Sequence, residues 1–347
     1  MDIYNYFYNL ENVNKILTSD KIKIALTNQE YNLMLIACDF FKNDNTIFVV
    51  LPNLYQAQKY YDSLASFINE DDILFFPSDE LVSAEMVAAT GDFLFERIQT
   101  IYTLLQGQKK IVILNMHAAI KYEMSPKVWK DNVFTLKVND TINIDDLCHR
   151  LIKLGYESVY TIGKTGEFSK RGSIVDIFPF GYTNPIRLDF FGDDIEQIKE
   201  FNSETQRSIS NIDSVNILPV SEFIYSATDY QIAKNKILSF MDKYKLSQIE
   251  EDNFKQDLFK LSEHKDLNLL SRYLKFFEND VSTIFDFVKN PRIYFVDPIK
   301  SKEGFDQLIL DLNEYCGRIG GYSIMNMDFF ENVNNVINRA NVLIEGL

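Results

Sequence analysis

Residues 166–194 read GEFSKRGSIVDIFPFGYTNPIRLDFFGDD, and this stretch contains two strand patterns separated by turn residues. Residues 172–178 and 185–191 are rich in β-branched and aromatic side chains, and proline or glycine bounds each run. Gly192 and the two aspartates after it predict a tight turn into a third strand at residues 195–201. Closely spaced strands joined by short turns are typical of antiparallel pairing. Because a helical pattern precedes them, we predict an α+β domain with an antiparallel sheet.

The strand predicted at residues 185–191 carries a two-sided pattern. Side chains alternate across a strand, so Arg187, Asp189 and Phe191 share one face, and the two apolar residues between them point to the core. An aromatic ring beside an arginine on a polar sheet face is typical of a protein-interface hot spot. We therefore expect this face to be exposed and to bind another protein.

Two other interpretations of the same residues remain open. Arg187 and Asp189 could form an ordinary surface ion pair, which contributes about 0–1 kcal/mol. Phe191 could instead cap a small second core beneath the preceding helix. We also expect Arg171 to open the strand before this one, and to lie near the same face if the two strands are neighbours.

The first third of the chain alternates between strand and helix patterns. Strands are predicted at residues 22–26, 46–51, 73–76 and 111–114, and helices at residues 29–42, 54–68 and 94–105. Such alternation predicts a parallel sheet that is covered on both faces. After Pro219 the pattern is mostly helical and polar, with one clear strand at residues 292–296.

These changes of pattern divide the 347 residues into three segments. Residues 1–133 are predicted to form a degenerate, nucleotide-binding-like parallel α/β domain. Residues 134–220 form the inserted α+β domain with the antiparallel sheet, in which a helix at residues 145–154 precedes the strands. Residues 221–347 are predicted to be mostly helical and to complete the α/β domain. The predicted fold class is therefore α/β with an inserted α+β domain.

Charge and composition exclude several classes of function. A net charge of −15 and a pI near 4.7 argue against strong DNA binding, because phosphate contacts require a basic surface. The three cysteines lie far apart without metal-ligand spacing, as expected of reduced thiols in a cytoplasmic protein. No apolar run reaches the about 18 residues needed to cross a membrane, and no signal peptide is visible.

A nucleotide site and a catalytic site are both expected to be absent. Residues 26–33 read LTNQEYNL at a strand-to-helix turn, where a phosphate-binding loop needs glycine and lysine, and Glu30 would repel a triphosphate. His117, His149 and His264 have no metal-ligand spacing. Paired carboxylates lie at turns and helix starts, where they suit capping. We predict no catalytic residue, no cofactor and no metal.

The central motifs carry a resemblance to a known family. The runs GEFSKRGSIVDIFPFG, PIRLDFFGDDIEQIKEF and NSETQRS are similar to the second domain shared by Mfd, the bacterial transcription-repair coupling factor, and the helicase-like repair protein UvrB. The resemblance covers residues 45–219, and the remainder of the chain to Leu347 is only faintly similar. UvrB has a working Walker A loop and a long aromatic β-hairpin. Residues 26–33 lack the first, and residues 77–96 are too short for the second, so the chain resembles the N-terminal region of Mfd.

This resemblance implies the roles of the segments. Residues 1–133, 134–220 and 221–347 would be the UvrB-like domains 1a, 2 and 1b of a fragment, since the chain has no translocase motor motifs. Full-length Mfd is expected to be an ATP-dependent DNA translocase. The fragment would have no ATPase of its own. The alternative that the resemblance leaves is an ATP-dependent UvrB-type DNA repair helicase subunit.

The resemblance also implies the binding residues. Domain 2 would bind the excision-repair protein UvrA, and the family's binding residues fall on Arg171, Arg187 and Phe191. The expected role is recruitment, which links a stalled RNA polymerase to nucleotide excision repair. In full-length Mfd a C-terminal autoinhibitory domain is expected to cover this surface. Because we expect Arg187 to be exposed, we expect the fold to survive its replacement by alanine.

Overall fold

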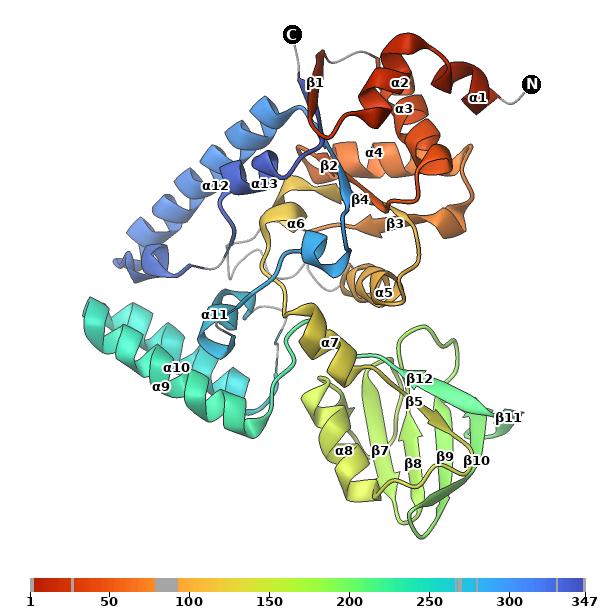
Figure 1. Ribbon diagram of the computed structural model, residues 1–347. Helices are drawn as coiled ribbons and strands as arrows, with labels where there is room; N and C mark the ends of the chain where they lie inside the picture. Colours follow the sequence, from red (N-terminus) through yellow and green to blue (C-terminus); the bar gives the residue numbers. More distant parts are fainter. Residues whose placement is uncertain are drawn as a thin grey trace. The chain divides into compact units, whose positions relative to one another are not determined.

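The computed structural model describes residues 3–25, 28–78, 93–265, 267, 270–278, 280–328 and 330–345. The chain divides into two compact units (Figure 1). The first contains residues 1–123 and 281–347, and the second contains residues 124–280. The second unit is therefore inserted into the first.

A six-stranded parallel sheet forms the centre of the first unit. Its strands are β1 (Ile22–Ala25), β2 (Ile47–Leu51), β3 (Ile73–Phe76), β4 (Ile111–Asn115), β13 (Arg292–Val296) and β14 (Val342–Glu345). They lie in the order β1-β14-β13-β2-β4-β3, and every pairing is parallel. β2, β4 and β13 are buried along their whole length, which is why they read as continuous apolar runs.

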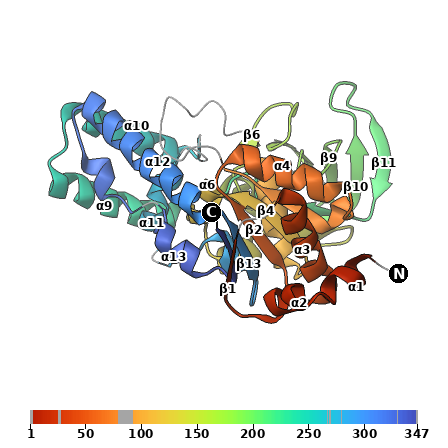
Figure 2. The same ribbon diagram turned by 90° about the horizontal axis from the view of Figure 1, so that it is seen from above.

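Helices cover both faces of this sheet, as Figure 2 shows. One face packs against α2 (Glu11–Thr18), α3 (Gln29–Lys42) and α4 (Leu54–Ala65), with α1 (Ile3–Tyr8) beside α3. The other face carries α5 (Leu94–Leu105), α6 (Met116–Ile120), α12 (Pro298–Ile319) and α13 (Val333–Asn338). The short 3-10 helices η1 (Glu70–Asp72), η5 (Ile284–Phe287) and η6 (Ser323–Asn326) complete the unit.

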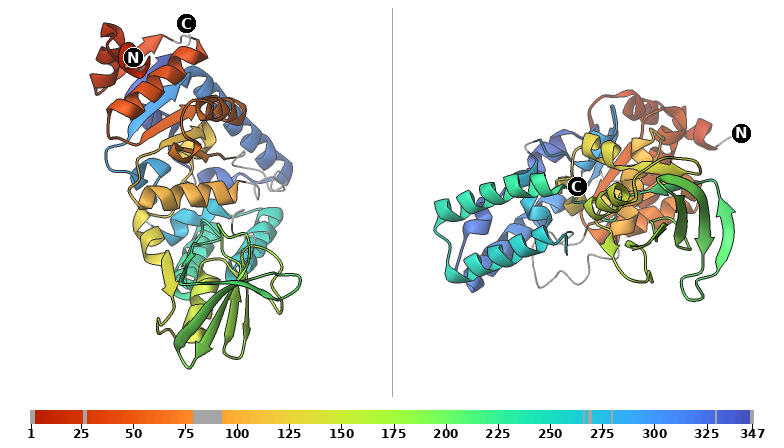
Figure 3. Two further views of the ribbon diagram at one scale, coloured as in Figure 1. Left: turned by 90° about the vertical axis from the view of Figure 1, so that its right-hand side faces the viewer. Right: turned by 90° about the horizontal axis from the view of Figure 1, so that it is seen from below.

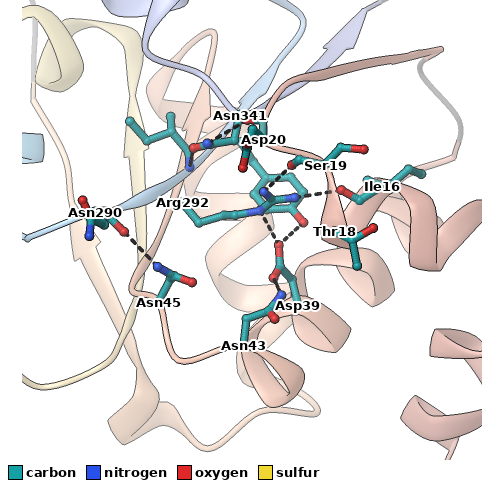
Figure 4. Close-up of polar contacts among 12 residues, drawn as sticks. Ile16, Thr18, Ser19, Asp20, Asp39, Asn43, Asn45, Asn290, Arg292 and Asn341 are labelled. Carbon is teal, nitrogen blue, oxygen red and sulfur yellow. Dashed lines mark hydrogen bonds and ion pairs between the residues drawn. The ribbon is translucent and has the colours of Figure 1, made fainter.

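A buried polar cluster joins the late strand β13 to the start of the chain (Figure 4). Arg292 Nε donates to Asp39 Oδ2 at 3.0 Å, and its two Nη atoms donate to the carbonyl oxygens of Ser19 at 2.7 Å and Ile16 at 2.8 Å. The Tyr294 hydroxyl donates to the same carboxylate. Because Asp39 is fully buried, the arginine both neutralises its charge and satisfies carbonyls at the end of α2.

The second unit contains a six-stranded sheet that is antiparallel except at one edge. Its strands are β6 (Glu157–Ser158), β7 (Glu167–Arg171), β8 (Ile174–Ile177), β9 (Ile186–Phe191), β10 (Asp194–Phe201) and β11 (Ser208–Ile212). Neighbouring strands follow chain order, and only β6 and β7 pair in parallel. A separate two-stranded sheet pairs β5 (Phe134–Lys137) with β12 (Ser214–Ile217).

One face of the antiparallel sheet packs against α8 (Ile144–Lys153), which lies beside β7 and β8 in Figure 1. Lys170 of β7 forms an ion pair with Asp145 of α8. Phe168 is two residues from Lys170 on the same strand, so this is the face of the apolar side chains. Leu147 and Leu151 of α8 are fully buried, and α8 is the only helix that the structure describes between residues 134 and 220. The sheet face opposite α8 is called the open face.

The rest of the second unit is helical. α7 (Pro126–Asn132) precedes the sheet, and α9 (Ala227–Tyr244), α10 (Gln248–Ser262), η4 (Ser271–Tyr273) and α11 (Leu274–Phe277) follow it. Figure 3 shows α9 and α10 side by side. Each of these two helices begins with a capping box, formed by Ser226 with Asp229 and by Ser247 with Glu250.

The predicted fold class is confirmed, because the parallel sheet and the separate antiparallel sheets are both present. The compact units do not follow the three predicted segments. Residues 221–280 pack with the middle segment, and residues 281–347 pack with the first. Among the described residues, no helix is long and apolar enough to cross a membrane.

Candidate protein-binding site

Phe191 projects from the open face of the antiparallel sheet. It ends β9, and its side chain is 75% exposed, whereas Leu188 and Phe190 are buried on the other face. Gly192 follows with a φ of 64°, a left-handed conformation that lets the chain turn at once into β10. Phe191 therefore does not cap a second core, which removes that interpretation of the ring.

Arg187 lies on the same face, but its guanidinium is not a free surface group. The side chain is only 17% exposed. Its Nε donates to Asp176 Oδ1 at 2.7 Å, and one Nη donates to Asp176 Oδ2 at 2.9 Å. The expectation of an exposed Arg187 is wrong, because the neighbouring strand β8 presents a buried carboxylate directly opposite it.

The alternative pairing of Arg187 with Asp189 is also not formed. Asp189 instead forms an ion pair with Lys199 of β10, with 2.7 Å between Nζ and Oδ2. Arg187 has two further contacts. Its guanidinium lies 4.3 Å from the centre of the Phe201 ring, and it donates to Gln206 Oε1 at 3.2 Å. The hydrogen bonds with Asp176 raise the pKa of Arg187 above its ordinary value.

Arg171 reaches the same carboxylate from a third strand. Its Nη2 donates to Asp176 Oδ2 at 2.5 Å, and its side chain is 40% exposed. Arg171 ends β7 and does not open β8 as the sequence suggested. Gly172, at a φ of 60°, reverses the chain immediately after it, so β7 and β8 form a hairpin and the strand predicted at residues 172–178 is β8 alone. The three predicted residues thus share one face of the sheet, Arg171 on β7 and both Arg187 and Phe191 on β9, with β8 between these strands.

The sequence did not single out Asp176 or Gln206. The signal for Asp176 was present, because a carboxylate stands between the buried residues Val175 and Ile177 in the apolar run of β8. A charged residue at such a position needs a cation partner to be buried. Gln206 gave no such signal, since it lies in the turn that joins β10 to β11 and contacts Arg187 only through the fold.

The strand-to-helix turn at the start of the chain is short. β1 ends at Ala25 and α3 begins at Gln29, while Leu26 and Thr27 lie outside the described residues. The Asn28 side chain accepts from the backbone N–H of Tyr31 at 3.0 Å, so it caps the helix. No group of three or more possible metal ligands occurs within the described ranges. The segment compared with the UvrB hairpin lies largely in residues 79–92, outside the described residues.

Comparison with known proteins identifies relatives of the chain. Residues 134–223 match the family described as the UvrB interaction domain. The chain is 32% identical to the transcription-repair-coupling factor of Bacillus subtilis (strain 168) over 266 residues, which cover 74% of this chain and 22% of that protein.

Two staphylococcal relatives align over more of the chain. The transcription-repair-coupling factor of Staphylococcus aureus (strain bovine RF122 / ET3-1) is 27% identical over 91% of this chain and 27% of that protein. That of Staphylococcus epidermidis (strain ATCC 12228 / FDA PCI 1200) is 26% identical over 89% of this chain and 27% of that protein. The chain therefore spans about a quarter of the length of these relatives, and the resemblance predicted from residues 166–208 is confirmed.

Proposed function

Because the chain contains a UvrB interaction domain and is related over most of its length to the transcription-repair-coupling factors, we propose that it recruits UvrA. In this role it links a stalled RNA polymerase to nucleotide excision repair. The sheet face that carries Arg171, Arg187 and Phe191 is the proposed contact. All three residues lie inside the matched segment 134–223.

One observation carries the proposal. The Phe191 ring is 75% exposed at the end of β9, on the sheet face that also carries Arg187 of β9 and Arg171 of β7. Exposing a ring of this size to water has a free-energy cost that the fold could avoid with a polar residue. Aromatic and arginine side chains together supply most hot spots in protein interfaces. A protein partner that buries this ring accounts for the arrangement.

We further propose that the chain has no ATPase of its own. Three residues separate β1 from α3, and the Asn28 side chain already accepts from one of the free N–H groups at the start of the helix, that of Tyr31. A phosphate-binding loop needs those N–H groups and a lysine near them. A titration with ATP and Mg2+ should therefore give no binding at micromolar concentrations. Micromolar affinity would favour the UvrB-type helicase alternative.

The remaining domains of the longer relatives are the second proposed class of partner. The aligned residues cover 22% and 27% of two of these relatives, so most of their length lies elsewhere. We propose that a C-terminal autoinhibitory domain covers the Phe191 face in a full-length protein and that UvrA competes for it. The translocase activity would reside in that remaining length, outside this chain.

The direct test is UvrA binding by a Phe191→Ala variant. Truncating a desolvated hot-spot residue typically costs about 2 kcal/mol, so we expect affinity to fall about thirtyfold. Phe259→Ala is the matched control, because Phe259 is 61% exposed on α10, outside the matched segment. Neither change should alter the melting temperature, since both rings contact mainly solvent.

Titration calorimetry with purified UvrA gives the comparison. A thirtyfold loss for Phe191→Ala, with parent affinity for Phe259→Ala, supports the proposed contact. Equal affinity for the parent chain and Phe191→Ala would place the UvrA contact elsewhere. Absence of any UvrA binding by the parent chain would remove the proposed function.

A further inference from the structure

Asp176 occupies the centre of the proposed contact without being part of its surface. It lies on β8, between Ser169 of β7 and Arg187 of β9 in the strand register. Its side chain is 1% exposed. The contact therefore rests on a carboxylate that a partner protein cannot reach directly.

The carboxylate of Asp176 is shared by the two arginines of the contact. Oδ1 accepts from Arg187 Nε, while Oδ2 accepts from an Nη of Arg187 at 2.9 Å and from Nη2 of Arg171 at 2.5 Å. One oxygen atom thus fixes the separation of the two guanidinium groups. Since two positive charges share one negative charge, the cluster keeps a net charge of about +1 toward the solvent side.

The other contacts of Arg187 would not fix it equally well. The Gln206 side chain gives one neutral hydrogen bond at 3.2 Å, and the Phe201 ring restrains the plane of the guanidinium but not its rotation. Bidentate hydrogen bonds to a carboxylate are stronger and geometrically more specific. Arg171 is more exposed, and it donates to the same carboxylate.

We propose that Asp176 is a positioning residue for UvrA docking, because it holds Arg171 and Arg187 side by side in the geometry that the partner meets. This inference rests on the proposed function. Arginine side chains lose rotamer freedom when they enter an interface, and a free pair would lose more than a pair that is already fixed. The preformed pair therefore lengthens the lifetime of the complex.

The test is the dissociation rate of UvrA from an Asp176→Asn variant of the full chain. The amide keeps the size of the side chain but removes its charge and places a donor beside two donors. We expect dissociation to become at least about tenfold faster. The association rate should not fall, because the variant surface is more positive by one charge.

Asp39→Asn is the matched control. Asp39 is also a buried carboxylate paired with an arginine, Arg292, but it belongs to the first unit. The Asp39→Asn variant should lose stability, as Asp176→Asn does. It should nevertheless release UvrA at the same rate as the parent chain. Both variants are measured at a temperature at which circular dichroism gives the parent spectrum.

A spectroscopic readout separates positioning from general stability. The Nε–H signal of Arg187 should exchange slowly with water in the parent chain, because Nε donates to Asp176. It should exchange rapidly in Asp176→Asn. If that variant does not fold, Asp176→Glu replaces it. Glutamate keeps the negative charge, but its extra methylene displaces the carboxylate, which can then no longer hold both arginines at these distances. Faster dissociation is therefore again expected.

The outcomes distinguish this inference from the proposed function. Parent-like dissociation of UvrA from Asp176→Asn, or from Asp176→Glu where that one is used, overturns the positioning role. If Phe191→Ala weakens binding under the same conditions, UvrA docks on this surface although Asp176 has no positioning role. If neither the Phe191 nor the Asp176 variants change UvrA binding, the docking surface itself is wrong.

Discussion

At the scale of single residues, two arginines that look equivalent in the sequence have different roles. Arg187 has a 17% exposed side chain and makes two hydrogen bonds with the buried Asp176, whereas Arg171 is 40% exposed and makes one. Removing one partner of a buried ion pair leaves an uncompensated charge. Replacing Arg187 should therefore lower the stability of the second unit more than replacing Arg171, although both arginines belong to the proposed contact.

We predict that Arg187→Ala destabilises the second unit by about 2 kcal/mol, since Arg171 still neutralises part of the buried charge. Arg171→Ala should cost at most about 1 kcal/mol, as for an exposed pair. The measurement is urea unfolding followed by tryptophan fluorescence. Trp129, fully buried on α7, is the chain's single tryptophan and reports on this unit. A larger loss for Arg171→Ala than for Arg187→Ala would contradict this ranking.

His264 gives the second unit a dependence on pH. Its ring stacks on Tyr225 with 4.5 Å between the ring centres, and burial lowers the pKa of His264 below its ordinary value of 6.5. The unfolded chain then binds a proton at a higher pH than the folded chain. Stability is therefore complete above the ordinary pKa and is lost as the pH falls toward the lowered one.

The pKa of His264 can be measured by an NMR titration, and we expect a value below 6.5. His264→Asn is the companion variant, because asparagine tolerates the left-handed backbone at this position, where φ is 52°. Urea unfolding at pH 7 and pH 5.5 should show a smaller loss of stability in the variant. A pKa at or above 6.5 would contradict the effect of burial.

At the scale of secondary-structure elements, the sequence predicted most of the strands that lie in the core, but not β14. β3 and β13 have the predicted bounds, and β9 alternates as expected, because burial imposes a strong apolar pattern on these strands. β7 and β11 were not predicted as separate strands. β11 is exposed at the sheet edge and reads SISNI, so no apolar face marks it.

The buried polar cluster of Figure 4 connects elements that are distant in the sequence. Arg292 opens β13 and bonds to Asp39 of α3 and to carbonyls at the end of α2. This contact could not be predicted from a local pattern, because Arg292 and Asp39 are 253 positions apart. The cluster therefore stabilises the closure of a unit built from two chain segments.

We predict that Arg292→Met destabilises the first unit by about 3 kcal/mol, since it leaves the Asp39 carboxylate buried without a cation. Hydrogen exchange followed by mass spectrometry should show reduced protection in α2 and β13. The Trp129 fluorescence transition should remain at the parent urea concentration, because that tryptophan belongs to the other unit. Unchanged exchange in α2 would show that the cluster does not hold this helix.

At the scale of the whole molecule, the chain leaves the first unit and returns to it at adjacent points. The backbone N–H of Glu123 donates to the Ser282 carbonyl at 2.8 Å, and that of Ser282 donates to the Glu123 carbonyl at 3.0 Å. The sequence predicted residues 221–347 as one segment. It predicted that this segment completes the α/β domain, but not the places of β13 and β14 in the first sheet, because pairing between distant strands leaves no local pattern.

We predict that residues 124–280 fold as an independent unit, because their ends meet at this bridge and they have their own core. The excised fragment should show one cooperative unfolding transition by Trp129 fluorescence. It should bind UvrA with nearly the affinity of the whole chain. A fragment that stays unfolded, or a folded one that does not bind UvrA while the whole chain does, would show that the first unit is required.

The most direct measurement is photo-crosslinking from position 191. Replacing Phe191 by the photoreactive analogue p-benzoylphenylalanine in the full chain keeps an aromatic ring at the end of β9. Irradiation with UvrA should give a covalent complex, and the same substitution at the exposed Phe259 should give none. Equal crosslinking from both positions, or crosslinking from Phe259 alone, would contradict UvrA docking on the open face of the antiparallel sheet.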